Sequence, residues 1–158
     1  MHGCSNDHIQ HSASVDDPFD QNMPSAIIVD DSPIMRAQLR RVLTEAGFRV
    51  SAEAGNAEKL VDLYAEHTPD VVTLDIVMPG TDGATAAREL LLRFPDAKVV
   101  MCSSISAREK ILACQQAGVR TYLLKPFKPE HAVAVFRSLA ERSAPAAAAA
   151  TTGEGVHP

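Results

Sequence analysis

Five short apolar runs alternate with five amphipathic stretches, and this alternation limits the fold more than any other feature of the sequence. The runs are short enough for strands, whereas the stretches between them carry apolar side chains at helical spacing. Strands that alternate with helices form a parallel sheet with right-handed crossovers and helices on both faces. We therefore expect a single α/β sandwich. The five predicted strands cover residues 26–29, 50–54, 71–74, 99–102 and 122–124.

The residues between the runs indicate where helices begin and end. Ser32 followed by Pro33 supplies an N-cap and a proline for the first helical position, while Gly47 and Gly118 stand where the first and fourth helices should end. The second helix is expected to include Ala57, the fourth Ala107, and Pro145 is expected to stop the fifth.

Length, charge and cysteine content restrict the class of protein. A chain of 158 residues suits one domain, and a net charge of −5 without a basic patch argues against nucleic-acid binding. No unbroken membrane-spanning run and no signal-peptide pattern is seen, so we expect a cytoplasmic protein without membrane insertion. Cys102 and Cys114 fall within apolar patterns, which favours reduced packing residues.

Both ends of the chain differ in composition from the middle. Residues 1–24 are polar and aperiodic, and residues 143–158 are rich in alanine and proline, so we expect two flexible tails around one domain at residues 25–142. The stretch after the fifth helix is too short for a DNA-binding or catalytic module. We therefore expect a stand-alone domain that acts by docking onto another protein.

Charged side chains stand where the predicted strands stop. Asp30 and Asp31 follow the first run, Asp75 follows the third, and Lys125 follows the fifth. In parallel sheets, ligands gather beyond the carboxyl ends of the strands, so these side chains should converge. Crowded carboxylates raise one another's pKa unless a cation neutralises them, and one or two carboxylates with a carbonyl and waters suit Mg²⁺. The sequence thus predicts a magnesium site.

A free aspartate beside a bound cation can attack phosphorus and form an acyl phosphate, and Asp75 is the candidate nucleophile. Lys125 offers a positive charge to phosphoryl oxygens, and Ser103, at the end of the fourth strand, offers a hydroxyl donor. Singly, each residue has a simpler explanation as a helix cap, a turn former or a solvated strand end. Jointly they favour a site, because all lie at one edge of the predicted sheet.

Four sequence motifs stand at the predicted strand ends: VDDS at residues 29–32, LDIVMPGTDG at 74–83, CSS at 102–104 and YLLKPF at 122–127. With these motifs in this order, the chain resembles the receiver domains of bacterial two-component response regulators, over about residues 25 to 142. Residues 35–36 and 53–56 are most similar to the chemotaxis (CheY-like) type.

The resemblance implies a role for each site residue. Asp75 would accept the phosphoryl group; Asp30, Asp31, Asp75 and the backbone carbonyl of Val77 would hold Mg²⁺. Ser103 and Lys125 would contact the phosphate. It also implies the flavodoxin-like strand order 2-1-3-4-5 and a cis peptide bond before Pro126.

Switching and partners also follow from the resemblance. Ser103 would move toward the phosphoryl group and Tyr122 would turn inward, which reshapes the face made by the fourth helix, fifth strand and fifth helix. Taken alone, an aromatic at a strand start is simply a packing residue. The donor would be a histidine kinase, since the chain has no Gly-rich nucleotide loop. The target would be a flagellar motor switch protein or another chemotaxis component, and the receiver a monomer or a phosphorylation-dependent dimer.

Two positions near the phosphoryl site are apolar where several relatives carry a polar side chain: Val77 and Ile105. Neither can orient an attacking water, so we expect self-dephosphorylation to be slow without a phosphatase.

Other functions stay open. A phosphorelay intermediate or a phosphate sink would share this architecture, and a pseudo-receiver would bind partners without phosphorylation. A phosphatase with an aspartyl nucleophile is a further alternative, but its common pattern needs a second aspartate where Val77 stands. We do not expect an enzyme, beyond self-phosphorylation from small donors and self-dephosphorylation.

Overall fold

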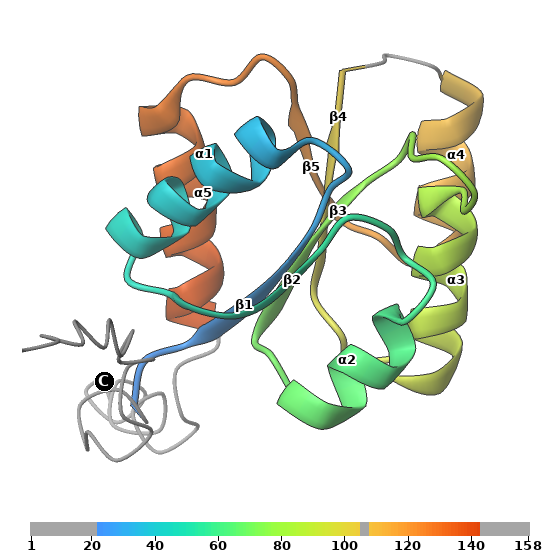
Figure 1. Ribbon diagram of the computed structural model, residues 1–158, viewed down its shortest axis with the longest axis horizontal. Coiled ribbons are helices and arrows are strands. Elements are labelled where there is room, and N and C mark those ends of the chain that lie inside the picture. The colour runs from blue at the N-terminus through green and yellow to red at the C-terminus, as the bar shows by residue number, and fades with distance from the viewer. Residues whose placement is uncertain (1–21, 105–107, 143–158) are drawn as a thin grey trace, which may run out of the picture.

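The computed structural model describes residues 22–104 and 108–142, and all statements on structure refer to these. They form a five-stranded parallel sheet with helices on both faces (Figure 1). The strands are β1 Ser25–Val29, β2 Arg49–Ala54, β3 Val71–Asp75, β4 Val99–Ser103 and β5 Thr121–Leu124. The helices are α1 Pro33–Glu45, α2 Leu60–His67, α3 Gly83–Arg93, α4 Arg108–Ala117 and α5 Pro129–Arg142.

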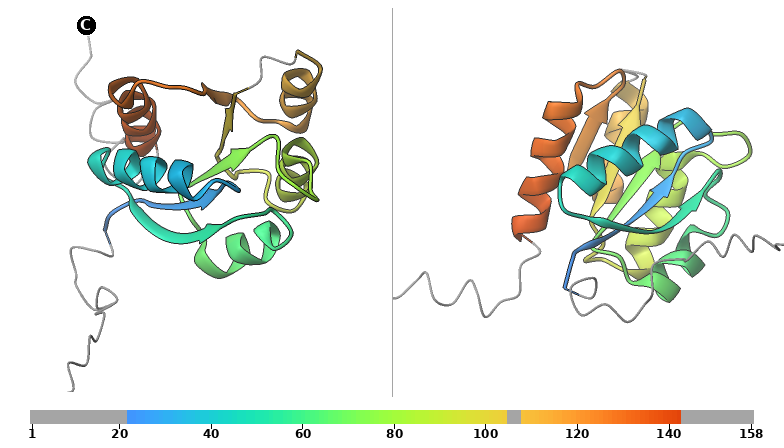
Figure 2. Two further views of the ribbon diagram at one scale, coloured as in Figure 1. Left: turned by 45° about the horizontal axis from the view of Figure 1, so that its top comes forward. Right: turned by 60° about the vertical axis from the view of Figure 1, so that its left-hand side comes forward.

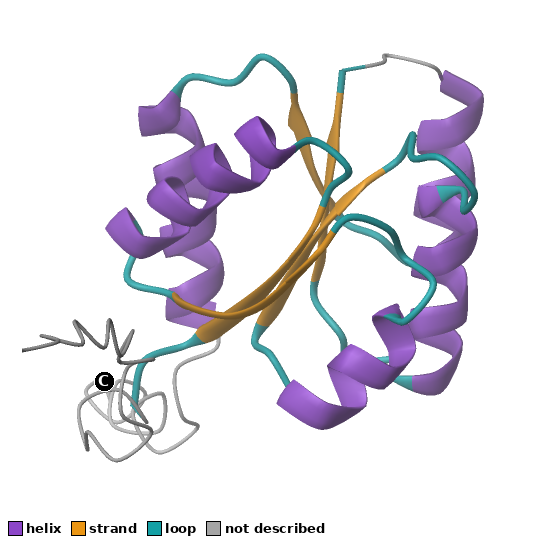
Figure 3. Cartoon of the chain, in the orientation of Figure 1, coloured by secondary structure: helices purple, strands orange, loops and turns teal. Residues whose placement is uncertain are grey.

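The strand order is β2-β1-β3-β4-β5, which confirms the order that the resemblance implies. Helices α1 and α5 cover one face of the sheet, and α2, α3 and α4 cover the other (Figures 1 and 2). All five strands run in the same direction, so their carboxyl ends share one edge, from which the loops to the following helices leave (Figure 3). Any site made from strand ends must lie at this edge.

Strand burial explains the apolar runs in the sequence. Strands β1, β3 and β4 are buried at every position, because helices cover both of their faces. Alternate residues serve the two sides: Ile27 and Val29 belong to the core under α2, α3 and α4, whereas Ile28 belongs to the core under α1 and α5. The edge strands β2 and β5 are less buried.

The predicted helix boundaries hold at most ends. The Ser32 hydroxyl accepts a hydrogen bond from the backbone of Met35 and Pro33 opens α1. Gly47 and Gly118 have positive φ angles of 94° and 105° just after α1 and α4, a conformation that glycine adopts without strain. The prediction that the second helix includes Ala57 is wrong: Ala57 is buried but precedes α2. The Asn56 side chain accepts from the backbone of Glu58, and this local turn delays the helix.

Some predictions concern residues outside the described ones. They include residues 1–21 of the N-terminal tail, the whole C-terminal tail, Ile105, Ala107 and Pro145. Within the described part, Cys102 and Cys114 are buried and unpaired, as expected for reduced packing residues. None of the described helices is long and apolar enough to cross a membrane.

Candidate functional site

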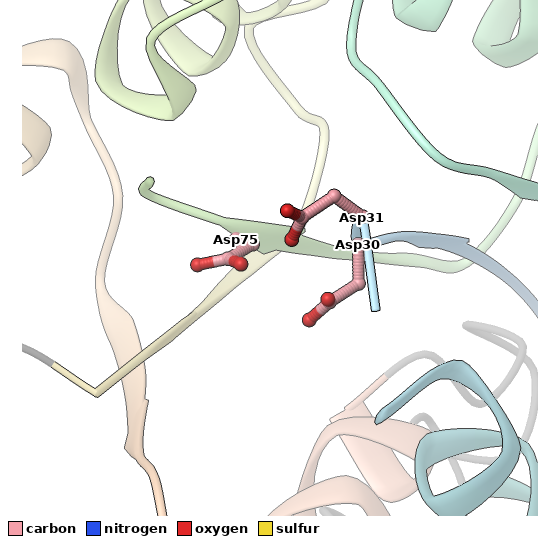
Figure 4. Close-up of side chains that lie close together, drawn as sticks. All are labelled: Asp30, Asp31 and Asp75. Atoms are coloured by element: carbon pink, nitrogen blue, oxygen red, sulfur yellow. The ribbon is translucent and has the colours of Figure 1, made fainter. Parts of the chain in front are cut away.

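Three carboxylates meet at the carboxyl edge of the sheet. Asp30 and Asp31 follow β1, and Asp75 is the last residue of β3, the strand that pairs with β1. Each offers an oxygen atom within 4.8 Å of the others, and Figure 4 shows the three side chains around one small region. Asp30 and Asp75 are buried, whereas Asp31 is exposed. The predicted acidic cluster is therefore present, open to solvent on the side of Asp31.

Lys125, the residue that follows β5, joins this cluster. Its Nζ lies 2.7 Å from Asp30 Oδ2 and 3.3 Å from Asp75 Oδ2, so one ammonium group is shared by two buried carboxylates. The Lys125 side chain is only 12% exposed, which shields these ion pairs from water. The peptide bond that follows, to Pro126, is cis, the isomer that the resemblance implies.

The loop after β1 is held in place by two contacts that the sequence reasoning missed. The backbone N–H of Ser32 donates to Asp30 Oδ1 at 2.9 Å, and Arg36 Nη1 donates to the Asp30 carbonyl oxygen at 2.6 Å. Arg36 lies one helical turn into α1 and reaches back over the loop. These bonds fix the Asp30 carboxylate toward Lys125. The sequence shows an arginine four residues after the N-cap serine, but it does not show that this side chain points back to the Asp30 carbonyl.

Gly83 is a second residue whose role went unassigned. Its N–H donates to the Ile76 carbonyl at 2.9 Å, which brings the first turn of α3 against the end of β3. A β-carbon at this position would overlap the carbonyl oxygen of Asp75 and come within 2.7 Å of the Ile76 Cα. Only glycine permits this approach, so Gly83 sets the backbone position of Asp75. The sequence motif includes Gly83, but it does not show that the close approach of α3 to β3 requires glycine there.

Two pKa values at the site are raised, one mainly by burial and the other by neighbouring carboxylates. Burial raises the pKa of the Asp75 carboxyl, Lys125 opposes this, and Asp30 adds to it. Burial lowers the pKa of Lys125, but the hydrogen bond to Asp30 and the charges of Asp75 and Asp30 outweigh burial, so the net pKa is raised. A protonated Lys125 thus supports an ionised Asp75, and a further cation would support it more.

The remaining predicted residues, Ser103, Val77 and Tyr122, make different contacts. Ser103 is buried at the end of β4, and its carbonyl accepts from the backbone of Lys125 at 2.8 Å. Val77 donates its N–H to Asp75 Oδ1 at 3.2 Å, and its own side chain is 44% exposed. Tyr122 does not join the cluster. Its hydroxyl lies 3.4 Å from the Ile111 carbonyl and 3.3 Å from the Val119 carbonyl, beside α4.

The donor set fits the divalent ion that the sequence predicts. The cluster consists of carboxylate oxygens, which hard cations such as Mg²⁺ prefer. The exposed Asp31 leaves one side accessible, so a hydrated ion can keep several of its waters. Asp30, Asp31 and Asp75, with the Val77 carbonyl, are the residues that could hold it.

The fold and the site define a class of proteins: α/β domains with a doubly wound parallel sheet that have an acid cluster and a lysine at the carboxyl edge of the sheet. Comparison with known proteins makes the class specific. Residues 26–137 match the response regulator receiver domain family, which is more than half of the chain. The chain belongs to this family of signalling domains.

Individual relatives agree with the family assignment. The chemotaxis protein CheY of Thermotoga maritima is 37% identical over 107 residues, covering 68% of this chain and 89% of that protein. CheY of Bacillus subtilis is 39% identical over 104 residues, covering 66% and 87%. Among solved structures, a CheX-CheY-BeF₃-Mg²⁺ complex from Borrelia burgdorferi matches with a TM-score of 0.70 and 31% identity, covering 77% of this chain and 92% of that one.

Proposed function

We propose that this receiver accepts a phosphoryl group on Asp75 from the phosphohistidine of a histidine kinase, with Mg²⁺ as cofactor. One observation supports this above all: a buried carboxylate stands within 4.8 Å of two further carboxylates and 3.3 Å from the ammonium group of Lys125, whose side chain is only 12% exposed. A purely structural strand end would not need this concentration of charge.

Transfer forms a bond between one Asp75 carboxylate oxygen and phosphorus. It breaks the P–N bond of the donor, whose imidazole nitrogen leaves with the electron pair and takes up a proton. Lys125 carries the positive charge nearest to Asp75 and can turn its ammonium toward a phosphoryl oxygen. Ser103 supplies a hydroxyl at the end of the neighbouring strand. Bound Mg²⁺ would neutralise charge on the phosphoryl oxygens.

The output of the proposed switch is a protein contact. Ser103 and Tyr122 lie on β4 and β5, and we propose that phosphorylation changes the face formed by α4, β5 and α5, which then binds a target. The similarity to CheY proteins favours a chemotaxis component such as a flagellar motor switch protein. We propose that the protein acts in the cytoplasm, either as a monomer or as a phosphorylation-dependent dimer.

Mass spectrometry of the intact chain after incubation with Mg²⁺ and acetyl phosphate tests the proposal. We expect one phosphoryl adduct in the native chain and none in Asp75→Asn. Asp62→Asn is the matched control, because Asp62 is an exposed residue on α2 outside the acid cluster, and it should be labelled normally. No adduct in the native chain would indicate a pseudo-receiver, and multiple turnover on a phosphate ester would indicate a hydrolase.

A pull-down separates the remaining alternatives. Phosphorylated native chain and Asp75→Asn are compared for bound proteins. A target that binds only the phosphorylated chain supports the switch. If the phosphoryl group instead passes on to a histidine of a second protein, the chain is a phosphorelay intermediate. If it is lost without any phosphorylation-dependent partner, the chain is a phosphate sink.

A further inference from the structure

A cleft lies at the amino ends of the strands, whereas the acid cluster lies at their carboxyl ends. The cleft has a volume of about 530 Å³ and includes the first residues of β4 and β5, whereas the acids lie at the last residue of β3 and just after β1. Its walls come from the end of α3, the end of α4 and the last turns of α5. This size suits a small organic ligand.

The cleft combines an apolar floor with a basic rim. Leu91 from α3 and the buried Leu139 from α5 contribute apolar surface. Three cations line it, Lys98, Arg120 and Arg142. Asp96 is the single acid among the described lining residues, so the local balance is positive although the whole chain has a net charge of −5.

We propose that this cleft binds an organic anion: an aromatic or branched apolar body that carries one carboxylate, sulfonate or phosphate group. The apolar body would cover the leucine side chains, and the anionic group would face the guanidinium groups of Arg120 and Arg142. Guanidinium groups form paired hydrogen bonds with such oxyanions. A neutral ligand would gain only the apolar contact.

The position of the cleft gives such a ligand access to β5, the strand that leads to Lys125. Thr121 belongs to the cleft wall and is the first residue of β5. Arg120 directly follows Val119, whose carbonyl oxygen lies 3.3 Å from the Tyr122 hydroxyl. A bound anion therefore touches the segment that leads into β5 at the end remote from Asp75.

Two fluorescent probes that differ by one charged group test the proposal on the full chain. 8-Anilinonaphthalene-1-sulfonate is an apolar body with one sulfonate, and N-phenyl-1-naphthylamine is the same body without it. We expect the sulfonate to bind with one-to-one stoichiometry, and the neutral probe to bind about tenfold more weakly. Amide resonances of residues 118–121 should shift on titration. Equal binding of both probes would overturn the proposal, since it would reflect apolar contact alone.

Paired variants identify the site. The double variant Arg120→Gln and Arg142→Gln should weaken sulfonate binding about tenfold and leave the neutral probe unchanged. The matched control is Arg41→Gln with Arg88→Gln, which removes two exposed arginines outside the cleft; Arg88 lines a separate cavity between α3 and α4. The control should bind like the native chain. Equal loss in both pairs would refute the site.

Acetyl phosphate labelling of Asp75 is measured in the same variants. None of the four arginines belongs to the acid cluster, so labelling should stay normal in all of them. Normal labelling without selective sulfonate binding would refute the cleft while leaving the proposed phosphorylation intact.

Discussion

Two parts of the sheet are built differently: the acid half, which consists of β1 and β3, and the β5 half, which consists of β5. Strands β1 and β3 are buried at every residue and lead to Asp30 and Asp75. Backbone N–H groups donate to both carboxylates, and Arg36 donates to the Asp30 carbonyl oxygen. Strand β5 is an edge strand with two half-buried residues and one exposed one, and it contributes Tyr122 and leads to Lys125. The acid half is thus tightly constrained, whereas the β5 half has fewer constraints.

This difference suits the proposed division of roles. A nucleophile and its metal ligands need fixed positions, because small displacements reduce the rate of group transfer. A switch needs an element with two arrangements of similar free energy, and half-buried edge strands are better suited to this. Lys125 connects the halves through its ion pairs with Asp30 and Asp75. Substitutions in each half should therefore have effects of different size.

The largest effect is expected from Gly83→Ala in the acid half. The added β-carbon would overlap the Asp75 carbonyl oxygen, so α3 or the end of β3 must move. We expect a loss of about 3 kcal/mol in the free energy of unfolding, measured by urea denaturation. Acetyl phosphate labelling of Asp75 should slow as well.

Gly55→Ala is the matched control for this substitution. A β-carbon at Gly55 would have its nearest neighbour, Arg36 Nη1, at 3.5 Å, which is an ordinary contact. The stability of this variant should change by less than about 1 kcal/mol. If both alanine variants were equally stable, the packing of α3 against β3 would not set the position of Asp75.

The second prediction compares Lys125, which forms ion pairs with Asp30 and Asp75, with an exposed surface lysine. Lys125→Met leaves the buried Asp30 without its cation, so the free energy of unfolding in EDTA should fall by about 2 kcal/mol. Added Mg²⁺ should recover more stability in this variant than in the native chain, because it supplies the missing positive charge. Lys128→Met, three residues further and exposed, should be neutral in both conditions. Equal responses of the two variants to Mg²⁺ would contradict the shared site.

Much of the fold follows from the sequence because its signals are local. A fully buried strand must be apolar throughout, so β1, β3 and β4 were located to within a residue by their runs alone. The start of α2 was misplaced because apolar periodicity does not report the side-chain hydrogen bond of Asn56 that holds the preceding turn.

The site shows the same limit. Asp30, Asp31, Asp75 and Lys125 could be found because parallel strands bring their carboxyl ends to one edge. The contributions of Arg36 and Gly83 could not, since each depends on a distance across a loop. Sequence patterns carry the direction of strands but not the packing of one turn against another.

The third prediction concerns the lifetime of the phosphoprotein. Val77 follows Asp75 by two residues, and its exposed apolar side chain cannot orient an attacking water. Val77→Asn should increase the decay rate of phosphorylated Asp75 by about tenfold, measured by loss of the adduct mass after removal of the donor. Val77→Ile keeps the site apolar and should decay like the native chain. An unchanged decay rate in the asparagine variant would contradict the prediction that decay is slow because no polar side chain orients the attacking water.

The smallest effect is expected in the β5 half, where Tyr122 gives a spectroscopic signal. Burial, with a smaller contribution from Cys114, raises the Tyr122 pKa to about 12. The chain has no tryptophan and two tyrosines, so Tyr64→Phe leaves Tyr122 as the only aromatic hydroxyl. Tyrosinate absorbance of this variant should rise near pH 12 when folded and near pH 10 in denaturant.

The sign of the accompanying stability change follows from proton binding. Between about pH 10 and 12 the folded state holds a proton on Tyr122 that the unfolded state has lost, so this residue's contribution to stability falls as pH rises through that range. If the folded variant titrated near pH 10, the Tyr122 hydroxyl would be fully solvated. The Tyr122 side chain would then not pack beside α4 in solution, as it does in the structure.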